Sequence, residues 1–386
     1  MNNILYVTVP FFLDFDLPLI ARLKKSLDIH VLILVKPNSK SATIFDLNDV
    51  VLKQGFTEIN LIKHHLPKYY ENFIDFNKTY IYNTNSSSAK SFKNILGQFH
   101  LYKFARKYNN IYTNGFLPLS FLFPLFSRSL NLFLNIHDPF PHTGESNFID
   151  QFLKKLNIKK AKKLILYNKN QADRFVKTHN LTRDQYINVS LGLYETYNFL
   201  KINNKTSLNI NFKNPTLFFF GRIVEYKGIE FLIDAVNELN GEGIKINTII
   251  AGAGKPYFDI NKIDSTHTTF INRYLTQYEL ADLLQNIDAV VCPYTDATQS
   301  GVIMTAYTFG KPVISTDTGG LSEMLVSQNL TYLAKPKSVS SLKDKIKLWY
   351  DNYEHINYKA VIGESYEVGD KSWDNTAKKI IEHLNS

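Results

Sequence analysis

Two cationic side chains lie in a short, glycine-flanked loop of this sequence. The segment Phe220-Gly-Arg-Ile-Val-Glu-Tyr-Lys-Gly228 follows an apolar, β-rich run and precedes an amphipathic one. Arg222 offers a planar fork to phosphate oxygens, and Lys227 offers a compact point charge. At the end of a strand, this pair is suited to bind a diphosphate. Taken alone, the loop is more typical of a solvated turn whose cations pair with Glu225 and Glu230.

A second candidate anion site lies in the segment Pro293-Tyr-Thr-Asp-Ala-Thr-Gln-Ser-Gly-Val302. It runs from an apolar strand-like run into a predicted helix that begins near Gly301. The N–H groups and the dipole at a helix start attract phosphate, and a glycine lets a ligand approach the backbone closely. The alternative is that Ser300 only caps the start of a buried helix, because serine is a preferred capping residue.

The elements that must position these loops alternate between strands and helices. Apolar, β-rich runs predict strands at 4–9, 30–35, 79–82, 110–113, 130–136, 163–167, 217–220, 248–251, 269–271, 289–292 and 312–315. Helical spacing predicts helices at 16–27, 229–239 and 277–285 and from about residue 301. We therefore predict an α/β fold of two Rossmann-like, doubly wound domains that face each other across a cleft, with ligands beyond the carboxyl ends of the strands.

The ordered motifs resemble a known family. The sequences FGRIVEYKGIEFLIDA, the glycine turn 251–254, PYTDATQSGV and FGKPVISTDTGGLSEML are similar to the C-terminal domain of retaining family 4 glycosyltransferases, which have the GT-B fold. Residues 135–145, NIHDPFPHTGE, look like the His-Asp loop of that family. The resemblance implies an acceptor-side domain at 1–200, a nucleotide-sugar-binding domain at 212–369 and a closing helix at 370–386 that packs back onto the first domain.

The resemblance also implies roles for individual residues. The diphosphate of the donor would be held by Arg222 and Lys227, and the transferred sugar would meet His137, which Asp138 follows. The donor site would be completed by residues from the loops after several strands: Gly221, Gly252, Asn272, Arg273, Tyr274, Thr298, Gln299, Ser300, Gly301, Val302 and Thr305. Acceptor contacts are expected from residues after the first strand and in the His-Asp loop: Phe11, Asp14, Asp16, His142 and Glu145. The His-Asp loop residues are equally suited to fixing the loop itself, and Phe11 to the core.

One departure from the family pattern concerns two glutamates that many members carry eight positions apart. Alignment through Gly310-Lys-Pro312 puts Ala297 and Thr305 at these positions. The second glutamate usually binds the ribose hydroxyls, and Thr305 can replace it only partly, because it has a single hydroxyl. We interpret the QSGV sequence as a trait of a subgroup, with an inactive homologue as the alternative.

The composition limits where and how the protein works. A single cysteine, Cys292, forms no internal disulfide and offers no cysteine cluster to a metal, which favours the cytoplasm. The start MNNILYVTVPFF is typical of a first strand and not of a signal peptide. We expect no cofactor and no metal, because two cations and a helix start can neutralise a departing diphosphate.

The net charge of +9 is unevenly distributed. Residues 1–195 carry 25 basic and 14 acidic side chains, a net charge of +11, and the remainder carries −2. This asymmetry indicates an anionic partner such as the inner face of the cytoplasmic membrane, with the basic run 154–163 and exposed Tyr69, Tyr70 and Phe73 as contacts. A compositional bias towards lysine and asparagine explains it equally well. No nucleic-acid-binding fingerprint is present, so we expect no nucleic-acid partner.

These observations together favour one function over two alternatives. We expect a glycosyltransferase that moves a sugar from a nucleotide-sugar donor, with retention, to a saccharide or lipid-linked saccharide, in the synthesis of bacterial surface polysaccharide. A sugar-nucleotide epimerase on the same architecture is the enzymatic alternative. A non-catalytic polyanion-binding protein, which would use the basic first half, is the alternative from another class.

Overall fold

The computed structural model describes residues 3–37, 40–42, 44–84, 86, 91–114, 131–137, 139–140, 148–167, 169–200, 208, 210 and 212–385. The chain forms two compact units. Unit 1 comprises residues 1–167, 172–190 and 372–386, and unit 2 comprises 168–171 and 191–371. Residues 191–200, which the sequence division placed in the first domain, cluster with unit 2. The Leu193 side chain, for example, lies directly against the backbone of Gly369, which also belongs to unit 2.

Unit 1 is built on an eight-stranded sheet in the order β10-β9-β8-β7-β1-β2-β6-β5. All neighbouring strands are parallel except β5, which pairs antiparallel with β6. Neither β5 nor β10 was predicted from the sequence. The strands are β1 (Asn3–Thr8), β2 (Asp28–Val35), β5 (Gly55–Glu58), β6 (Thr79–Asn83), β7 (Asn110–Asn114), β8 (Asn131–Ile136), β9 (Lys163–Tyr167) and β10 (Tyr186–Val189). A separate short ladder joins β3 (Ser41–Ala42) and β4 (Phe45–Asp46). The strand order reverses beside β1: β2, β6 and β5 lie on one side of β1, and β7, β8, β9 and β10 lie on the other.

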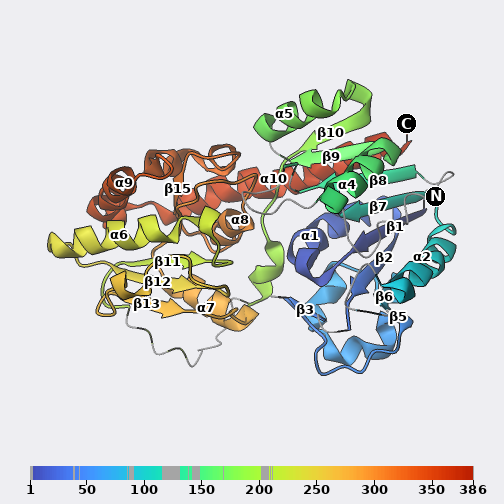
Figure 1. The fold of residues 1–386 in the computed structure, drawn as a ribbon, viewed down its shortest axis with the longest axis horizontal. Helices are drawn as coiled ribbons and strands as arrows, with labels where there is room; N and C mark the ends of the chain where they lie inside the picture. Colours follow the sequence, from blue (N-terminus) through green and yellow to red (C-terminus); the bar gives the residue numbers. More distant parts are fainter. Residues whose placement is uncertain are drawn as a thin grey trace. The chain divides into compact units, whose positions relative to one another are not determined.

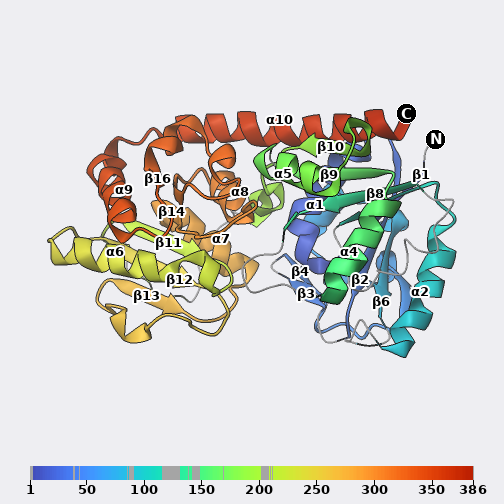
Figure 2. The ribbon, with the colours of Figure 1, turned by 45° about the horizontal axis from the view of Figure 1, so that its top comes forward.

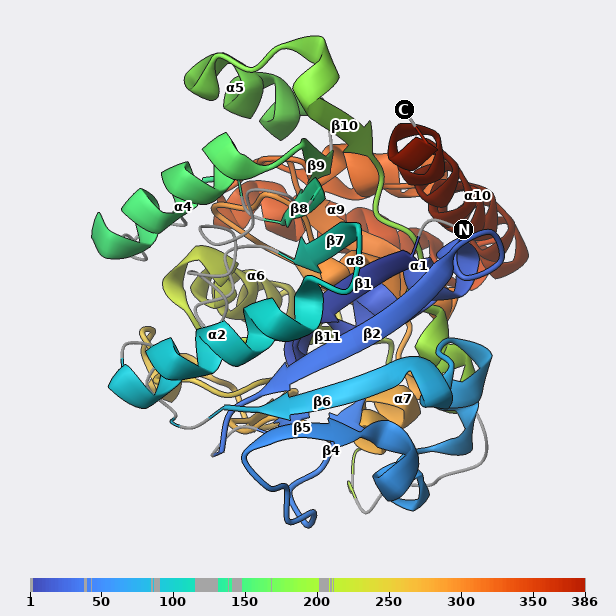
Figure 3. The same cartoon turned by 90° about the vertical axis from the view of Figure 1, so that its right-hand side faces the viewer.

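Helices cover both faces of this sheet (Figure 3). Alternate residues of the strands pack on one face against α2 (Phe92–Ala105), α4 (Phe148–Lys160) and α5 (Lys169–His179). The opposite face carries α1 (Leu13–Leu23), whose Phe15 ring contacts Tyr167 of β9 and Trp373 of α10 (Tyr358–Asn385). Short 3-10 helices complete the unit at Pro10–Phe12, Ile59–His65, Lys68–Asn72, Phe76–Lys78 and Arg183–Gln185. Burial on both faces explains why these strands read as continuous apolar runs.

Unit 2 contains a six-stranded, fully parallel sheet in the order β13-β12-β11-β14-β15-β16. Figure 1 labels β11, β12, β13 and β15 of this sheet. Its strands are β11 (Thr216–Phe220), β12 (Asn247–Ala251), β13 (Thr268–Ile271), β14 (Ala289–Cys292), β15 (Val313–Thr316) and β16 (Leu333–Ala334). The helices are α6 (Ile229–Gly241), α7 (Gln277–Asn286), α8 (Gly301–Thr308) and α9 (Val339–Asn352). Numbered from β11, this is the 3-2-1-4-5-6 order of a Rossmann fold, in which ligands bind beside the strand-order reversal. Here the reversal lies between β11 and β14.

Helix α10 is continuous over 28 residues and contributes to both units (Figure 2). It begins at Tyr358, well before the closing helix expected from residue 370. In unit 1 its Trp373 side chain is fully buried, the Thr376 hydroxyl donates to the carbonyl of Ser190, and the Lys379 ammonium donates to that of Asn188. The predicted fold class, two Rossmann-like α/β units with parallel sheets, is confirmed.

Candidate functional site

The loop after β11 presents its two cations on aromatic rings. Lys227 lies with its Nζ atom 3.6 Å from the centre of the Tyr294 ring and 5.2 Å from that of Tyr226. Arg222 is exposed, and one of its guanidinium nitrogens donates to the Tyr226 hydroxyl at 2.8 Å. A ring face attracts a cation, and each ring also restricts where its cation can move. The two cations are therefore held on a common support, next to the reversal point of the sheet.

The loops after β11 and β14 are fixed to each other through backbone contacts. The N–H of Thr295 donates to the carbonyl of Tyr226 at 2.8 Å. Gly228 has a positive φ of 64°, and a Cβ atom there would lie 2.1 Å from the carbonyl oxygen of Pro293. Any other residue at 228 would therefore combine backbone strain with a clash. This close approach brings Lys227 to the motif 293–302 and joins the two anion sites predicted from the sequence.

The two glycines assigned to the donor site also make a close backbone contact. A Cβ atom on Gly252 would lie 1.7 Å from the carbonyl oxygen of Gly221. Gly221 itself has a φ of 139°, and its N–H donates to Ala251 at 3.1 Å. The need for glycine at 252 thus follows from the packing of the loop after β12 against the loop after β11. A role of either glycine at a ligand stays a prediction.

Burial keeps the groups beneath Lys227 uncharged. It raises the pKa of the Cys292 thiol to about 11, although the positive charge of Lys227 acts in the opposite direction. Burial also raises the pKa of Tyr294 well above its usual value. The thiol and the phenol beside the Lys227 ammonium are therefore neutral at physiological pH.

The start of α8 has no side-chain cap. Ser300 occupies the capping position, but its hydroxyl makes no capping hydrogen bond, and its own N–H donates to the Met324 sulfur at 3.3 Å. Ser300 is therefore the N-cap residue of α8, as the alternative expected, but it does not cap the helix through its side chain. A Cβ atom on Gly301 would lie 2.5 Å from the Tyr194 hydroxyl oxygen, so this glycine also accommodates a neighbouring side chain.

The roles predicted for the other residues of this segment change in part. Thr305 is buried, and its hydroxyl donates to the carbonyl of Gly301 at 2.9 Å within α8. It is therefore not placed to bind ribose hydroxyls, which corrects the predicted substitution for a glutamate. Ala297 and Thr298 are buried, whereas Gln299 and Val302 are partly exposed. The donor contacts of these last residues stay a prediction.

At the edge strand β13, Arg273 is bound by a carboxylate that the sequence reading did not connect with it. Its guanidinium makes a bidentate ion pair with Glu279, at 2.6 and 2.9 Å. Hydrogen bonding by Arg273 lowers the pKa of Glu279 to about 2. Glu279 also completes a capping box with Thr276, a signal that the T-x-x-E spacing contained. Arg273 is thus bound to the first turn of α7 through Glu279. The neighbouring Tyr274 side chain is 68% exposed and is the more accessible of these two predicted donor-site residues.

His137 lies in unit 1 among aromatic rings. Its imidazole stacks on Phe12 with a centroid separation of 4.4 Å and an interplanar angle of 7°, and the Phe15 ring meets it edge-on at 4.5 Å. Tyr167 stacks beyond at 5.6 Å. His137 therefore follows β8 as expected, at the carboxyl edge of the sheet, with its ring plane fixed.

The three residues predicted to contact the acceptor from the segment after β1 differ in exposure. Phe11 is 70% exposed, and Asp14 is partly exposed at the start of α1. Asp16 is fully buried, and its carboxylate accepts hydrogen bonds from Tyr6, Thr8 and Asn114. A buried carboxylate with these partners has no access to an acceptor, which corrects the prediction for Asp16. Asp138, His142 and Glu145 lie outside the described residues.

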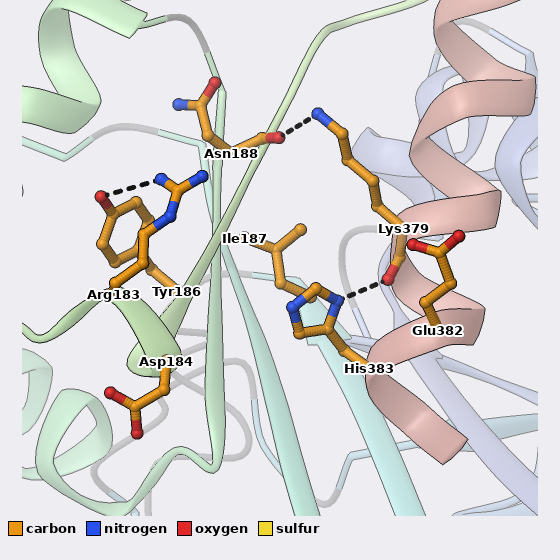
Figure 4. A pocket seen from close by; sticks show the side chains of 8 residues that line it. All are labelled: Arg183, Asp184, Tyr186, Ile187, Asn188, Lys379, Glu382 and His383. Carbon is orange, nitrogen blue, oxygen red and sulfur yellow. Dashed lines mark hydrogen bonds between the residues drawn. The ribbon is translucent and has the colours of Figure 1, made fainter. Parts of the chain in front are cut away.

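Two pockets in unit 1 lie near the amino ends of strands, away from His137. One, of about 530 Å³, is bounded by residues next to β10 and by Lys379, Glu382 and His383 of α10 (Figure 4). The other, of about 700 Å³, lies near the starts of β2 and β6 and is lined by Lys24, Lys25 and Lys63 among others. Neither contains a predicted site residue. Within the described ranges, His, Cys, Asp and Glu side chains form no group that could hold a metal ion.

The comparisons with known proteins agree with this architecture. A glycosyltransferase of Rickettsia africae superposes over 99% of this chain and 97% of its own, with a TM-score of 0.68 and 14% identity. The Anabaena protein HepE in complex with UDP matches over the full length of both chains, with a TM-score of 0.65 and 14% identity. The fold is GT-B. A UDP-GlcNAc 2-epimerase of Neisseria meningitidis is also similar, over 99% of both chains, with a TM-score of 0.60 and 13% identity.

One sequence match concerns the part of this GT-B chain that carries the two cations. Residues 214–352 match the family model described as glycosyl transferases group 1. An uncharacterized glycosyltransferase of Methanocaldococcus jannaschii is 28% identical over 190 residues, which is 47% of each chain. The chain thus spans about half the length of this curated relative. The residues that match the family model all lie within unit 2.

Proposed function

We propose that this protein is a glycosyltransferase that transfers a sugar from a nucleoside-diphosphate sugar to a saccharide or lipid-linked saccharide, with retention, as a QSGV-type member of family 4. The observation that carries the proposal is the pair of cations on the Tyr226 and Tyr294 rings, at the strand-order reversal of a group 1 glycosyltransferase domain. Bacterial surface polysaccharide, made at the cytoplasmic side, is the product class we propose.

The arrangement acts mainly through electrostatics. When the glycosidic bond to the donor breaks, negative charge develops on the departing diphosphate. Fixed positive groups stabilise such charge without reorganising, which lowers the barrier. Arg222 and Lys227 would supply this stabilisation together with the N–H groups at the start of α8, and His137 would contact the transferred sugar. We therefore expect activity without added divalent metal.

A thermal-shift screen of sugar nucleotides tests donor binding directly. A ligand that binds only the folded protein stabilises it by RT ln(1 + [L]/Kd), about 2.7 kcal/mol at a hundredfold excess over Kd. We expect UDP or another nucleoside diphosphate to raise the Tm by several degrees in EDTA, and the parent nucleoside to have no effect. Absence of any shift with all common nucleoside diphosphates and their sugars would contradict the proposal.

The structural similarity to an epimerase makes a second assay necessary. An epimerase converts its donor, or releases a free sugar, without an acceptor. A glycosyltransferase of the proposed kind leaves the configuration of the unused donor unchanged. Proton NMR of the donor, incubated with protein alone, separates the two functions. A new sugar epimer in that sample would favour the epimerase.

The proposed contact with an anionic membrane rests on α4 and the turn after it. Phe152 of α4 is 55% exposed. Four lysines in this region are also exposed: Lys155, Lys159, Lys160 and Lys162. The aromatic contribution predicted for Tyr70 and Phe73 is wrong, because both side chains are buried. Among the described residues, none of the helices has the length and apolar character needed to cross a membrane.

Vesicle sedimentation tests this contact. Each lysine near an anionic leaflet contributes roughly 1 kcal/mol, so replacing the four lysines of α4 and its turn by Gln should release most of the protein from phosphatidylserine vesicles. The matched control replaces four exposed lysines of unit 2, Lys245, Lys255, Lys335 and Lys347. Equal binding of both quadruple variants, or no binding of the wild type at low salt, would argue for a soluble acceptor.

A further inference from the structure

The carboxylate of Asp16 is the centre of a buried polar network under the carboxyl edge of unit 1. Its Oδ1 atom accepts a hydrogen bond from the Tyr6 hydroxyl at 2.6 Å. Its Oδ2 atom accepts from the Thr8 hydroxyl and from the Nδ2 group of Asn114. Asp16 and Asn114 are both completely buried. A buried carboxylate is costly to retain, so a network of this kind calls for an explanation beyond packing.

The carboxylate determines which way the Asn114 amide points. An ionised carboxylate only accepts hydrogen bonds, so it selects the NH₂ group of the amide and turns the amide oxygen to the opposite side. On that side, the Asn114 oxygen accepts from Nδ2 of Asn135 and lies 3.2 Å from Nε2 of His137. Asn135 is itself buried at the end of β8. Asp16 thus determines, through the orientation of the Asn114 amide, that an oxygen faces the His137 imidazole.

The consequence for His137 is a defined protonation site. Nε2 lies near two groups, the Asn114 oxygen and, at 3.3 Å, the Nδ2 group of Asn135. Because the Asn135 amino group already donates to the Asn114 oxygen, that oxygen is the acceptor toward which Nε2 points its proton, and the neutral ring then has its lone pair on Nδ1. Stacking between Phe12 and Tyr167 fixes the plane of the ring but does not distinguish its two nitrogens, because a ring face makes no such distinction. The contact between Nε2 and the Asn114 oxygen distinguishes the two ring nitrogens.

We propose that Asp16 is a positioning residue, which acts through Asn114 to hold His137 in the Nε2–H tautomer. The tautomer itself is independent of what the protein does. The catalytic consequence rests on the proposed function, in which His137 contacts the transferred sugar. The hydrogen bonds that link Asp16 through Asn114 to His137 all lie within unit 1.

The replacement Asp16→Asn keeps the shape of the side chain and reverses the polarity of the network. The introduced amide accepts from Tyr6 through its oxygen, so its NH₂ group takes the place of Oδ2 and faces Asn114. The Thr8 hydroxyl beside it can rotate to accept, whereas the Asn114 amide turns over and offers NH₂ to His137, which favours the Nδ1–H tautomer. Tyr6→Phe is the matched control, because it removes a donor from the same carboxylate and leaves the contact between Asp16 and Asn114 in place.

The tautomer is read from ¹⁵N–¹H spectra of protein labelled at its histidines, with the His137 signals assigned from a His137→Gln sample. At pH 8.5 an ordinary imidazole is neutral. We expect the Nε2–H form in the wild type and in Tyr6→Phe, and the Nδ1–H form in Asp16→Asn. The same tautomer in Asp16→Asn and in the wild type would overturn the proposal. If Asp16→Asn does not fold, Asn114→Ala decides: the exchange-protected Nε2–H signal should disappear, and its persistence would overturn the proposal.

Kinetics separate this proposal from the proposed function. In an active preparation, Asp16→Asn should lower kcat roughly a hundredfold, as a misplaced catalytic group does, with little change in the KM for the donor. Tyr6→Phe should keep most of its kcat. An unchanged kcat in Asp16→Asn, despite an altered tautomer, would refute the catalytic consequence. If the wild type shows no transfer with any donor, the proposed function fails, and the spectra still decide the role of Asp16.

Discussion

Replacing Lys227 by Gln is expected to lower kcat/KM roughly 10²- to 10³-fold, the loss typical of removing one fixed group that stabilises developing negative charge. The ammonium lies over the Tyr294 ring, whose hydroxyl is 3.5 Å from that of Ser300 at the start of α8. In the proposed function, the departing diphosphate accumulates charge there. Arg222→Ala should have a similar effect. Arg222→Lys should recover only part of the activity, because it restores the charge but not the planar fork.

The stability of the Lys227 variant should change little. A cation over a ring contributes about 0.5 to 2 kcal/mol, so the Tm should fall by a few degrees at most. Lys245→Gln is the matched control, because Lys245 is exposed at the amino end of β12, the opposite edge of the same sheet. Activity is measured with saturating acceptor while the donor is varied. Wild-type kcat/KM in both the Lys227 and the Arg222 variants would contradict a diphosphate site at this loop.

The second large effect concerns the pH dependence of stability. Burial raises the pKa of Asp16 to about 7, although hydrogen bonds from Thr8, Tyr6 and Asn114 act in the opposite direction. An unfolded aspartate has a pKa near 3.9. Between about pH 4 and pH 7 the folded protein therefore keeps a proton that the unfolded chain has released, so the free energy of unfolding falls as the pH rises. Three pKa units correspond to about 4 kcal/mol.

Asp16→Asn should remove this slope. Tyr6, Tyr112 and Tyr167 share the surroundings of Asp16, and burial keeps the pKa of each above its usual value, so they do not titrate in this window. The unfolding free energy of the variant, relative to the wild type, should rise by about 4 kcal/mol from pH 4 to pH 8. His137, which lies 3.2 Å from the Asn114 oxygen, is present in both proteins.

Urea unfolding followed by the fluorescence of Trp373 measures this difference for unit 1. The Trp349→Phe background removes the signal of unit 2, because the chain has two tryptophans. Thr8→Val provides an internal check, since losing a hydrogen bond that lowers the pKa of Asp16 should move the upper limit of the slope above pH 7. Parallel curves for Asp16→Asn and the wild type between pH 4 and pH 8 would show that Asp16 does not titrate as described.

The sequence predicted the fold from patterns that operate over short stretches. The run 217–220 is apolar because β11 is buried on both faces. A strand that is buried in this way can be predicted from its own residues, without knowledge of the strands it pairs with. The loop 220–228 was found in the same way, because its position after β11 follows from the local alternation. The antiparallel strand β5 was missed, since Gly55–Glu58 is short and only partly buried.

The contacts that define the site were less accessible to sequence reasoning. The Asp16–Asn114 hydrogen bond joins residues 98 positions apart, and no local pattern marks such a pair. Asp16 was predicted to contact an acceptor because it follows the first strand. The support of Lys227 was missed for a similar reason: Tyr294 belongs to another loop, and only the packing at Gly228 brings the two together.

The path of α10 affects the order in which the protein is completed during synthesis. Unit 1 includes residues 372–386, which the ribosome produces after residues 191–371 of unit 2. Until this segment emerges, Phe15 lacks the Trp373 ring, and Arg22 lacks its ion pair with Asp374. Domains generally fold as units while the chain is made, the N-terminal one first. Here residues 372–386 of unit 1 follow unit 2 in the sequence, so the nascent form of unit 1 must persist without these contacts to α1 while unit 2 is translated.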